Sequence, residues 1–344
     1  MAPAHYTRLV LQERPKGDID ANTFRRETIP FDLKPGSCQV LVRTEYVSID
    51  AAMRSWLRDV RSYIPPVQIG DVMRADGLAT VIEAGVDCKL KPGDIVRCTP
   101  GWAEYAVLDE KTCQALKVPP GAEPLDFLGP LGITGMTAYF GLHDVGKIKP
   151  GDTLVVSGAA GATGSLVCQL AKIHGAKVVA IAGSEDKCKW LTDELGVDVA
   201  FNYKSRTFYS DFKKRIGYID LFFDNVGGSL LNFMLTRLNK GARIVLCGAI
   251  SDYNSDKPTG LSAYSNLISQ RASLQGFIVF DYASRYREAR QEMAEWLASG
   301  KLKRRFQVVE GLENAPKALL MLYSGGNTGK LVVRVSSPRT QAKL

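Results

Sequence analysis

The sequence predicts an α/β protein in which a doubly wound parallel sheet is joined to a small β-barrel. Residues 1–124 contain short β-like runs separated by Pro-Gly turn signals, and this pattern is typical of a mostly antiparallel barrel. From about residue 150, apolar strands alternate with helices, which indicates a parallel sheet covered on both faces. A glycine-rich loop separates the first of these strands from its helix. A chain of 344 residues is long enough for about two such domains.

The barrel is predicted from runs such as "CQVLVRTEYVSI" and "DIVRCT", which are short and bounded by turns. The end of the chain returns to this mixed texture, with a helix near "APKALLMLYSG" and a strand "KLVVRV". We therefore expect residues 1–124 and 304–344 to form one barrel-like domain. Residues 125–303 are expected to form the domain that contains the parallel sheet.

The parallel sheet is predicted from five apolar runs: "TLVVSG", "KVVAI", "DLFFDN", "ARIVLCG" and "SLQGFIVF". A helix is expected over "GSLVCQLAKIHGA", where Gly175 ends it, and another through "KCKWLTDELG". Alternation of apolar strands with helices predicts a parallel sheet covered on both faces.

Composition and charge exclude several classes of protein. Hydrophobic residues make up 45% and charged residues 23%, and no apolar run approaches the roughly 18 residues that span a bilayer. The net charge of +8 comes from basic residues spread among acids, so nucleic-acid binding is not expected. Seven scattered cysteines predict reduced thiols, and we expect a cytoplasmic protein. Ala342, Lys343 and Leu344 resemble a peroxisomal address, which leaves import into peroxisomes as the alternative.

The glycine-rich loop "SGAAGATGS" predicts a dinucleotide site. Its glycines at 158, 161 and 164 follow a strand and open a helix. Glycines let the chain turn tightly and approach a pyrophosphate closely, while the free N–H groups of the helix point at the phosphates.

The end of the second strand predicts which dinucleotide binds. A carboxylate at this position would bind the ribose hydroxyls of NADH, but the chain has Ser184 and then Lys187. A hydroxyl and a cation suit a 2′-phosphate, and Tyr203 after the third strand could cover the same edge. We therefore expect NADPH, although Lys187 could also be a solvated helix lysine with Glu185 and Asp186 as its neighbours.

Three later strands end in segments that we expect at the same edge of the sheet. These segments are Asn225, residues 247–253, and residues 277–279. Ligands of open parallel sheets bind beyond the carboxyl ends of the strands. The alternative interpretations are that Asn225 shapes a turn and that residues 277–279 belong to the core.

Metal chemistry is not expected. The chain has three histidines, His5, His143 and His174, and none pairs with Cys or carboxylates at zinc-ligand spacing. The remaining chemistry is hydride transfer by the cofactor, with the protein orienting groups and donating hydrogen bonds.

Several motifs together resemble the zinc-free medium-chain dehydrogenase/reductases, in the branch of prostaglandin reductases and alkenal double-bond reductases. The motifs are "GMTAYFGL", "VSGAAGATGS", "AGSEDK", "FNYK", "FDNVGG", "CGAISDYN", "FIVFD" and "NTGK". The resemblance implies a catalytic barrel like the chaperonin-10 fold, interrupted by a Rossmann domain, in a homodimer. It implies NADPH-dependent reduction of the C=C bond of α,β-unsaturated ketones and aldehydes. Hydride goes to the β-carbon, an enolate forms, and a proton reaches the α-carbon.

The resemblance also implies which residues meet NADPH. Those at the pyrophosphate are Ala162, Thr163, Gly164 and Ser165. Those at the 2′-phosphate are Lys187 and Tyr203, with Ser184 as a helper suggested by the residues themselves. Those along the rest of the cofactor are Asn225, Cys247, Gly248, Ala249, Ile250, Ser251, Tyr253, Phe277, Ile278, Val279 and Asn327.

Tyr253 is the candidate catalytic residue. A phenol can donate a hydrogen bond to an enolate oxygen without a metal, while the alternative role is stacking on cofactor or substrate. One departure from the family pattern concerns the substrate pocket, because Ala51 and Ala52 replace a Pro-Tyr pair. This replacement suggests a wider pocket, in which Tyr46, Met53 and Trp56 are candidates to compensate.

Two rival functions remain open from the sequence. A quinone reductase shares the zinc-free architecture, and an inactive cofactor-binding relative, such as a lens or RNA-binding protein, shares the nucleotide site. Tyr253 and the intact segments beside the nicotinamide favour an active reductase.

Overall fold

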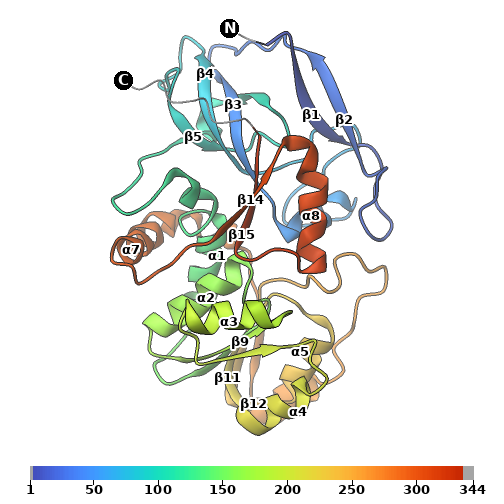
Figure 1. The fold of residues 1–344 in the computed structure, drawn as a ribbon, viewed down its shortest axis with the longest axis vertical. Coiled ribbons are helices and arrows are strands. Elements are labelled where there is room, and N and C mark those ends of the chain that lie inside the picture. The colour runs from blue at the N-terminus through green and yellow to red at the C-terminus, as the bar shows by residue number, and fades with distance from the viewer. Residues whose placement is uncertain (1–2, 336–344) are drawn as a thin grey trace.

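The computed structural model describes residues 3–335 and consists of two lobes, which lie one above the other in Figure 1. Most strands of the first 115 residues lie in the upper lobe, and the green and yellow strands and helices of the middle of the chain form the lower lobe. Ala342, Lys343 and Leu344 lie outside the described residues. Among the residues that are described, no helix is long and apolar enough to cross a membrane.

The lower lobe contains the expected doubly wound parallel sheet. Its six strands lie in the order β10-β9-β8-β11-β12-β13, and all neighbours are parallel. The bounds are β8 Thr153–Val156, β9 Lys177–Ala182, β10 Val199–Asn202, β11 Ile219–Asp224, β12 Leu238–Leu246 and β13 Ser273–Gly276. The strand order reverses between β8 and β11, so this pair is the switch point where such sheets bind dinucleotides.

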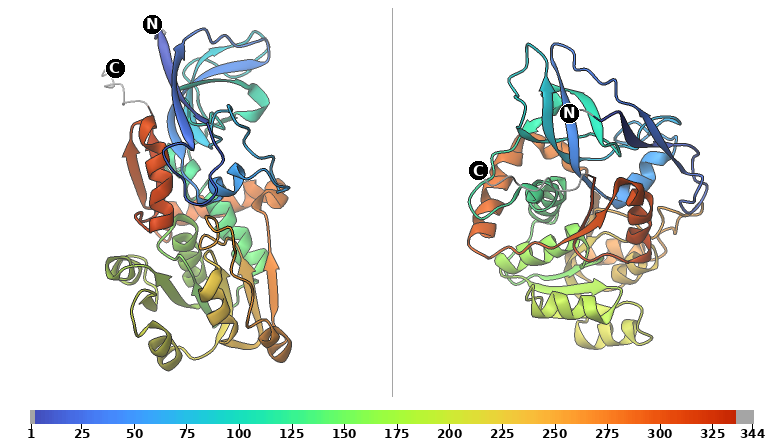
Figure 2. Two further views of the ribbon diagram at one scale, coloured as in Figure 1. Left: turned by 90° about the vertical axis from the view of Figure 1, so that its right-hand side faces the viewer. Right: turned by 45° about the horizontal axis from the view of Figure 1, so that its top comes forward.

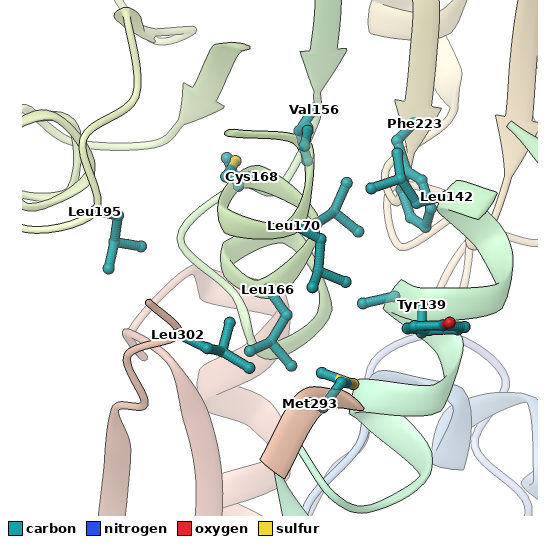
Figure 3. Packing of buried hydrophobic residues seen from close by; sticks show 14 of the residues in the cluster. Tyr139, Leu142, Val156, Leu166, Cys168, Leu170, Leu195, Phe223, Met293 and Leu302 are labelled. Atoms are coloured by element: carbon teal, nitrogen blue, oxygen red, sulfur yellow. The ribbon is translucent and has the colours of Figure 1, made fainter. Parts of the chain in front are cut away.

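Helices cover both faces of this sheet. Their bounds are α1 Ile133–Phe140, α2 Ala162–Ile173, α3 Glu185–Asp193, α4 Phe208–Arg215, α5 Gly228–Leu235, α6 Ser265–Gln270, α7 Tyr286–Ala298 and α8 Ala315–Ser324, of which α8 belongs to the upper lobe. On one face, Leu166 and Leu170 of α2 lie near Tyr139 of α1 and Met293 of α7 in a single buried cluster (Figure 3). On the other face, α4 and α5 bury apolar side chains against β11 and β12.

The upper lobe is built on a seven-stranded mixed sheet. Its strands are β3 Gln39–Ser48, β4 Gly77–Ala84, β5 Ile95–Cys98, β6 Tyr105–Asp109, β7 Gln114–Ala115, β14 Phe306–Glu310 and β15 Lys330–Arg334. β15 pairs antiparallel with β3, so the end of the chain joins the strands of its beginning. β14 and β15 are parallel, which makes the sheet mixed, but all its other pairs are antiparallel, as the sequence predicted. A separate antiparallel pair, β1 His5–Leu11 and β2 Phe24–Pro30, lies beside it.

Short helical turns connect these elements. They are η1 Ala51–Leu57, η2 Glu110–Thr112, η3 Pro124–Leu128, η4 Gly141–Val145, η5 Val279–Arg285 and η6 Leu312–Asn314. From the side, the two lobes remain distinct, and β14, β15 and α8 stand beside the blue strands of the upper lobe (Figure 2). All strands of the parallel sheet lie within residues 153–276, while the domain borders at 124 and 303 stay predictions.

One expected strand is shorter than predicted. The run "SLQGFIVF" forms a strand only over Ser273–Gly276, and η5 begins at Val279. β13 is an edge strand with β12 as its neighbour, so the sheet holds it on one side. The Phe277 ring instead packs so closely on Gly141 that a Cβ there would lie 2.6 Å from it. Residues 277–279 therefore leave the sheet, and Phe277 packs where α1 passes into η4, beside the cavity described next.

Candidate active site

A cavity of about 700 Å³ lies where the two lobes meet, at the carboxyl ends of the parallel strands. Its walls come from the glycine-rich loop, the ends of β9, β11 and β12, the segment after β13, and η1 of the upper lobe. Such a volume is in the range of small-molecule and cofactor sites. The sequence-predicted site segments therefore converge on one space.

The glycine-rich loop has the tight geometry that the sequence predicted. Gly158 has φ of +57°, and a Cβ on Gly164 would lie 2.4 Å from the carbonyl oxygen of Gly158. Gly161 precedes α2 without a side-chain cap, so the first N–H groups of the helix are available to a ligand. Ala162, Thr163 and Gly164 line the cavity.

Ser165, the fourth residue predicted at the pyrophosphate, does not line the cavity. Its side chain is buried, and its hydroxyl donates to the carbonyl of Ala162 at 3.2 Å, inside the first turn of α2. Its N–H donates to the carbonyl of Gly161 at 3.0 Å, so both the N–H and the hydroxyl of Ser165 are engaged within the first turn of α2.

The end beyond β9 and β10 is positively charged. Lys187, Tyr203 and Lys204 line the cavity there. The Lys187 ammonium donates to the carbonyl of Gly325 at 2.8 Å. Burial, and then the charge of Lys204, lower the pKa of Lys187. An anion between the two lysines would relieve this repulsion, so the residues present fit a 2′-phosphate.

Ser184 has a different role from the one expected. It is the N-cap of α3, and its hydroxyl accepts a hydrogen bond from the Lys187 N–H at 3.4 Å. It does not line the cavity. Glu185 and Asp186 are exposed and line a separate surface hollow, and Glu185 accepts from the Asn202 amide at 2.9 Å. The two carboxylates beside Lys187 therefore face away from the proposed phosphate position.

The end of β11 is fixed by a fully buried carboxylate. Ser157 donates to Asp224 at 2.7 Å, and Val226 and Gly227 donate their N–H groups to the same carboxylate. Burial raises the pKa of Asp224. The Asn225 side-chain amide in turn donates to the carbonyl of Ser157 at 2.8 Å, which holds Asn225 at the cavity wall.

Tyr253 lies at the junction of the two lobes. Its hydroxyl oxygen accepts a hydrogen bond from the Ala249 N–H at 3.3 Å, so its own proton is left to donate. Burial raises the pKa of Tyr253, which keeps the phenol protonated at neutral pH. Arg58, which follows η1, donates to the carbonyls of Tyr253 and Ser255 at 2.9 and 3.0 Å. The upper lobe thus holds the segment that carries the candidate catalytic residue.

Of the remaining predicted cofactor residues, most line the cavity and one does not. Those that line the cavity are Cys247, Gly248, Ile250, Ser251, Phe277, Ile278, Val279 and Asn327. Ala249 does not line it, and its Cβ packs near Gly227 instead. Asn327 lies on the loop before β15, which crosses the glycine-rich loop where the Gly329 N–H donates to the carbonyl of Ala160 at 2.8 Å.

Only part of the predicted substrate pocket is found at the cavity. Trp56 lines it, together with Ala51 and Ala52. Met53 is instead fully buried in the core of the upper lobe, where it packs in the same cluster as Leu57. Tyr46 of β3 is also absent from the wall, because Arg334 of β15 donates to its hydroxyl at 3.0 Å and holds the ring.

Sequence reasoning missed several residues of the substrate end. They are Tyr63, Arg74, Arg97, Phe280 and Tyr323, and Lys204 was missed at the opposite end. Lys204 directly follows Tyr203, so the same strand-end signal could have found it. Tyr63 carries no periodic signal, because it lies in a loop, where its hydroxyl accepts from the indole N–H of Trp56 at 3.0 Å. Its ring centroid lies 6.2 Å from that of Phe280.

Two ion pairs neutralise the carboxylates of the cavity wall. The Arg97 guanidinium donates to the Asp76 carboxylate at 2.7 Å, and the Lys330 ammonium lies 2.5 Å from the Asp50 carboxylate. Burial raises the pKa of Asp76, and Arg97 opposes this effect. Within residues 3–335, no group of three His, Cys, Asp or Glu side chains is placed to hold a metal ion.

Comparison with known proteins agrees with this architecture. A family model described as the N-terminal domain of oxidoreductase matches residues 7–116, and one described as zinc-binding dehydrogenase matches residues 162–299. The NADPH-dependent curcumin reductase of Escherichia coli is 38% identical over 96% of each chain. The NADP⁺-dependent 2-alkenal reductase of Nicotiana tabacum is 40% identical over 90% of this chain and 91% of its own.

A solved structure is similar over nearly the whole molecule. CurA of Vibrio vulnificus in complex with NADPH superposes with a TM-score of 0.90 at 39% identity, covering 96% of this chain and all of its own. The chain therefore belongs to the medium-chain dehydrogenase/reductase family, in the zinc-independent branch of alkenal and prostaglandin reductases.

Proposed function

We propose that this protein is an NADPH-dependent oxidoreductase that reduces the C=C bond of α,β-unsaturated ketones and aldehydes. The observation that carries the proposal is the single cavity that joins the lysine pair at 187 and 204 to Tyr253 and the Ala51-Ala52 wall. The names of the relatives, which include an alkenal reductase and a curcumin reductase, support the same reaction class.

The residues present fit NADPH as the cofactor. The loop around Gly161 and the N-terminus of α2 would hold the pyrophosphate, and Lys187, Lys204 and Tyr203 would hold the 2′-phosphate. The residues that would line the nicotinamide half are Asn225, Cys247, Gly248, Ile250, Ser251 and residues 277–279. Bound there, NADPH supplies a hydride to the β-carbon of the substrate.

Tyr253 would act on the charge that then develops. As the β-carbon gains hydride, electrons move to the carbonyl oxygen and form an enolate, which needs a hydrogen-bond donor. The Tyr253 hydroxyl is protonated and has its proton free, because it accepts from the Ala249 N–H. Protonation at the α-carbon completes the reaction. The phenol would therefore stabilise the enolate by donating a hydrogen bond to its oxygen.

A substrate panel tests this proposal. NADPH oxidation and product identification would be compared for a linear alkenal, an aryl-substituted enone and a quinone. We expect turnover of the first two, with the saturated ketone or aldehyde as product. A preference for the quinone would replace the proposal with quinone reduction, and NADPH binding without turnover of any substrate would replace it with an inactive cofactor-binding role.

A homodimer remains part of the proposal. β13 is an edge of the parallel sheet, and an open edge can pair with a second copy of the chain. Two apolar side chains are exposed here: Ile268 lies on α6, and Tyr264 lies just before it. Light scattering after gel filtration is expected to give twice the 37.6 kDa mass of one chain. We also retain a cytoplasmic location, with peroxisomal import through residues 342–344 as the alternative.

A further inference from the structure

Two cysteines of the upper lobe lie at the ends of paired strands: Cys98 is the last residue of β5, and Cys113 directly precedes β7. β5 and β7 are antiparallel, with Val96 opposite Ala115 and Arg97 opposite Gln114. The next position in this register brings Cys98 opposite Cys113. Cys98 is buried, Cys113 is half-buried, and both belong to one small apolar cluster of the lobe.

The register determines how close the two residues are. The Leu116 N–H donates to the carbonyl of Ile95 at 2.9 Å, which makes that pair a hydrogen-bonded one. Hydrogen-bonded and non-hydrogen-bonded pairs alternate, so Cys98 and Cys113 occupy a non-hydrogen-bonded position. Cα atoms there are about 4.5 Å apart. Disulfides span Cα separations of about 4.4–6.8 Å, so the backbone already allows a bond.

The two thiols also interact. The proximity of Cys98 lowers the pKa of Cys113, whereas Cys113 and burial raise that of Cys98. The Thr112 hydroxyl adds to the lowering at Cys113, while burial and the acidic Glu110 and Asp109 oppose it. Cys113 is therefore the thiol that more readily becomes a thiolate, and it is the more exposed of the two.

We propose that Cys98 and Cys113 form a reversible disulfide when the protein meets hydrogen peroxide. The Cys113 thiolate attacks one peroxide oxygen and becomes a sulfenic acid, with one water released after proton uptake. The Cys98 sulfur then attacks Sγ of Cys113, the S–O bond breaks, and a second water leaves with the Cys98 proton. The two thiols lose two electrons in total, and one peroxide is reduced to two waters.

The position of the pair connects it to the substrate end of the cavity. Successive side chains of a strand point to opposite faces, so Arg97 and Thr99 point away from the thiol of Cys98. Both residues line the cavity. A disulfide at Cys98 would therefore tether the strand that carries this part of the wall to β7.

Peptide mapping tests the proposal on the full-length protein. Trypsin cleaves after Arg97, Lys111 and Lys117, so Cys98 and Cys113 fall on the separate peptides 98–111 and 112–117. The reduced protein would be treated with increasing peroxide, free thiols would be alkylated, and the non-reduced digest would be examined by mass spectrometry. We expect the two peptides to appear joined, two hydrogens lighter than their sum, and to separate after dithiothreitol.

Matched variants identify the bond. Cys98→Ala and Cys113→Ser are expected to abolish the joined peptide, whereas Cys88→Ser, a nearby thiol that donates to the carbonyl of Gln39, is expected to leave it unchanged. Thermal unfolding would confirm that each variant is folded, and the wild-type digest decides the question by itself if one is not. The proposal is overturned if Cys113 stays reduced, proceeds to sulfinic acid without cross-linking, or joins a cysteine other than Cys98.

Discussion

Lys187 shows how one side chain can serve two partners. In the structure its ammonium is bound to the carbonyl of Gly325, close to Lys204 and partly withdrawn from water. A 2′-phosphate would replace mutual repulsion between two lysines by charge-assisted hydrogen bonds. The choice of cofactor therefore depends on a cation that the fold has already placed at the cavity.

Replacing this cation is expected to affect NADPH selectively. Lys187→Ala should raise the KM for NADPH by roughly 10- to 100-fold, the range of hydrogen bonds to charged groups, and change the KM for NADH little. Steady-state kinetics with both cofactors measures this difference. Lys189→Ala is the control, because Lys189 is exposed on the same helix and lines the other hollow. Equal effects on NADPH and NADH would contradict the assignment of a 2′-phosphate site.

Tyr253 is tested by removing a single oxygen atom. Tyr253→Phe keeps the ring and removes the proposed donor to the enolate, so kcat with an enone should fall roughly 100- to 1,000-fold. The Kd for NADPH, measured by fluorescence titration, should stay the same because the ring remains. An unchanged kcat would instead leave Tyr253 a packing role beside cofactor or substrate.

At the scale of elements, the contact between the end of α2 and η4 brings two half-buried imidazoles together. Nε2 of His143 lies 3.2 Å from Nε2 of His174, and Nδ1 of His174 lies 2.9 Å from the carbonyl of Leu170. One of the facing nitrogens must accept, so a proton on both would break the bond. Burial, then the charge of His174, lower the pKa of His143 to about 4.

This contact predicts a loss of stability in mild acid. In the unfolded chain His143 binds a proton near pH 6.5, whereas in the folded chain its pKa is about 4. The contribution of neutral His143 to the free energy of unfolding is therefore fully present above pH 6.5, and it decreases as the pH falls towards 4. In the wild-type protein the free energy of unfolding should fall between pH 7 and pH 5. In His143→Gln this fall should be smaller by about 1 to 2 kcal/mol, as measured by urea titration at both pH values. His5→Gln, at an exposed position, is the control, and the same pH dependence in both variants would refute the prediction.

At the scale of the whole molecule, the cavity exists because the two lobes are held together. Arg58 reaches from η1 to the segment of Tyr253, and Asn254 donates to Asp18 at 2.7 Å. Ala51 and Ala52 form part of the upper wall, facing residues of the lower lobe. The width of the substrate end therefore depends on small side chains in one lobe and aromatic ones in the other.

Filling this space should narrow the substrate range. Ala52→Tyr is expected to raise the KM of an enone with aryl groups on both sides about tenfold, while a linear alkenal is affected less. Comparing kcat and KM for the two substrates measures the change. Ala52→Ser is the matched control with little added volume. A uniform loss for both substrates would mean that position 52 acts on folding or cofactor binding and not on width.

Much of the nucleotide site could be predicted from the sequence because its signals are local. A glycine loop at a strand-to-helix junction, and the residues that end successive strands, lie at positions which the strand periodicity itself defines. Lys187, Tyr203 and Asn225 were found in this way, and the structure brings them to one cavity. The role of Ser184 as a helix cap could not be predicted, because a serine after a strand can serve as a cap or as a ligand and only the backbone geometry shows the cap; its contact with a phosphate stays a prediction.

The sequence by itself determined the parallel sheet, the glycine loop, and the absence of a carboxylate where a 2′-phosphate would lie. These follow from patterns within a few residues, which local geometry converts into structure. Only the tertiary structure decided the rest of the site. It buried Met53, turned Glu185 and Asp186 outward, and brought Tyr63 and Arg97 to the wall. Those outcomes depend on contacts between segments far apart in the chain, which no local pattern records.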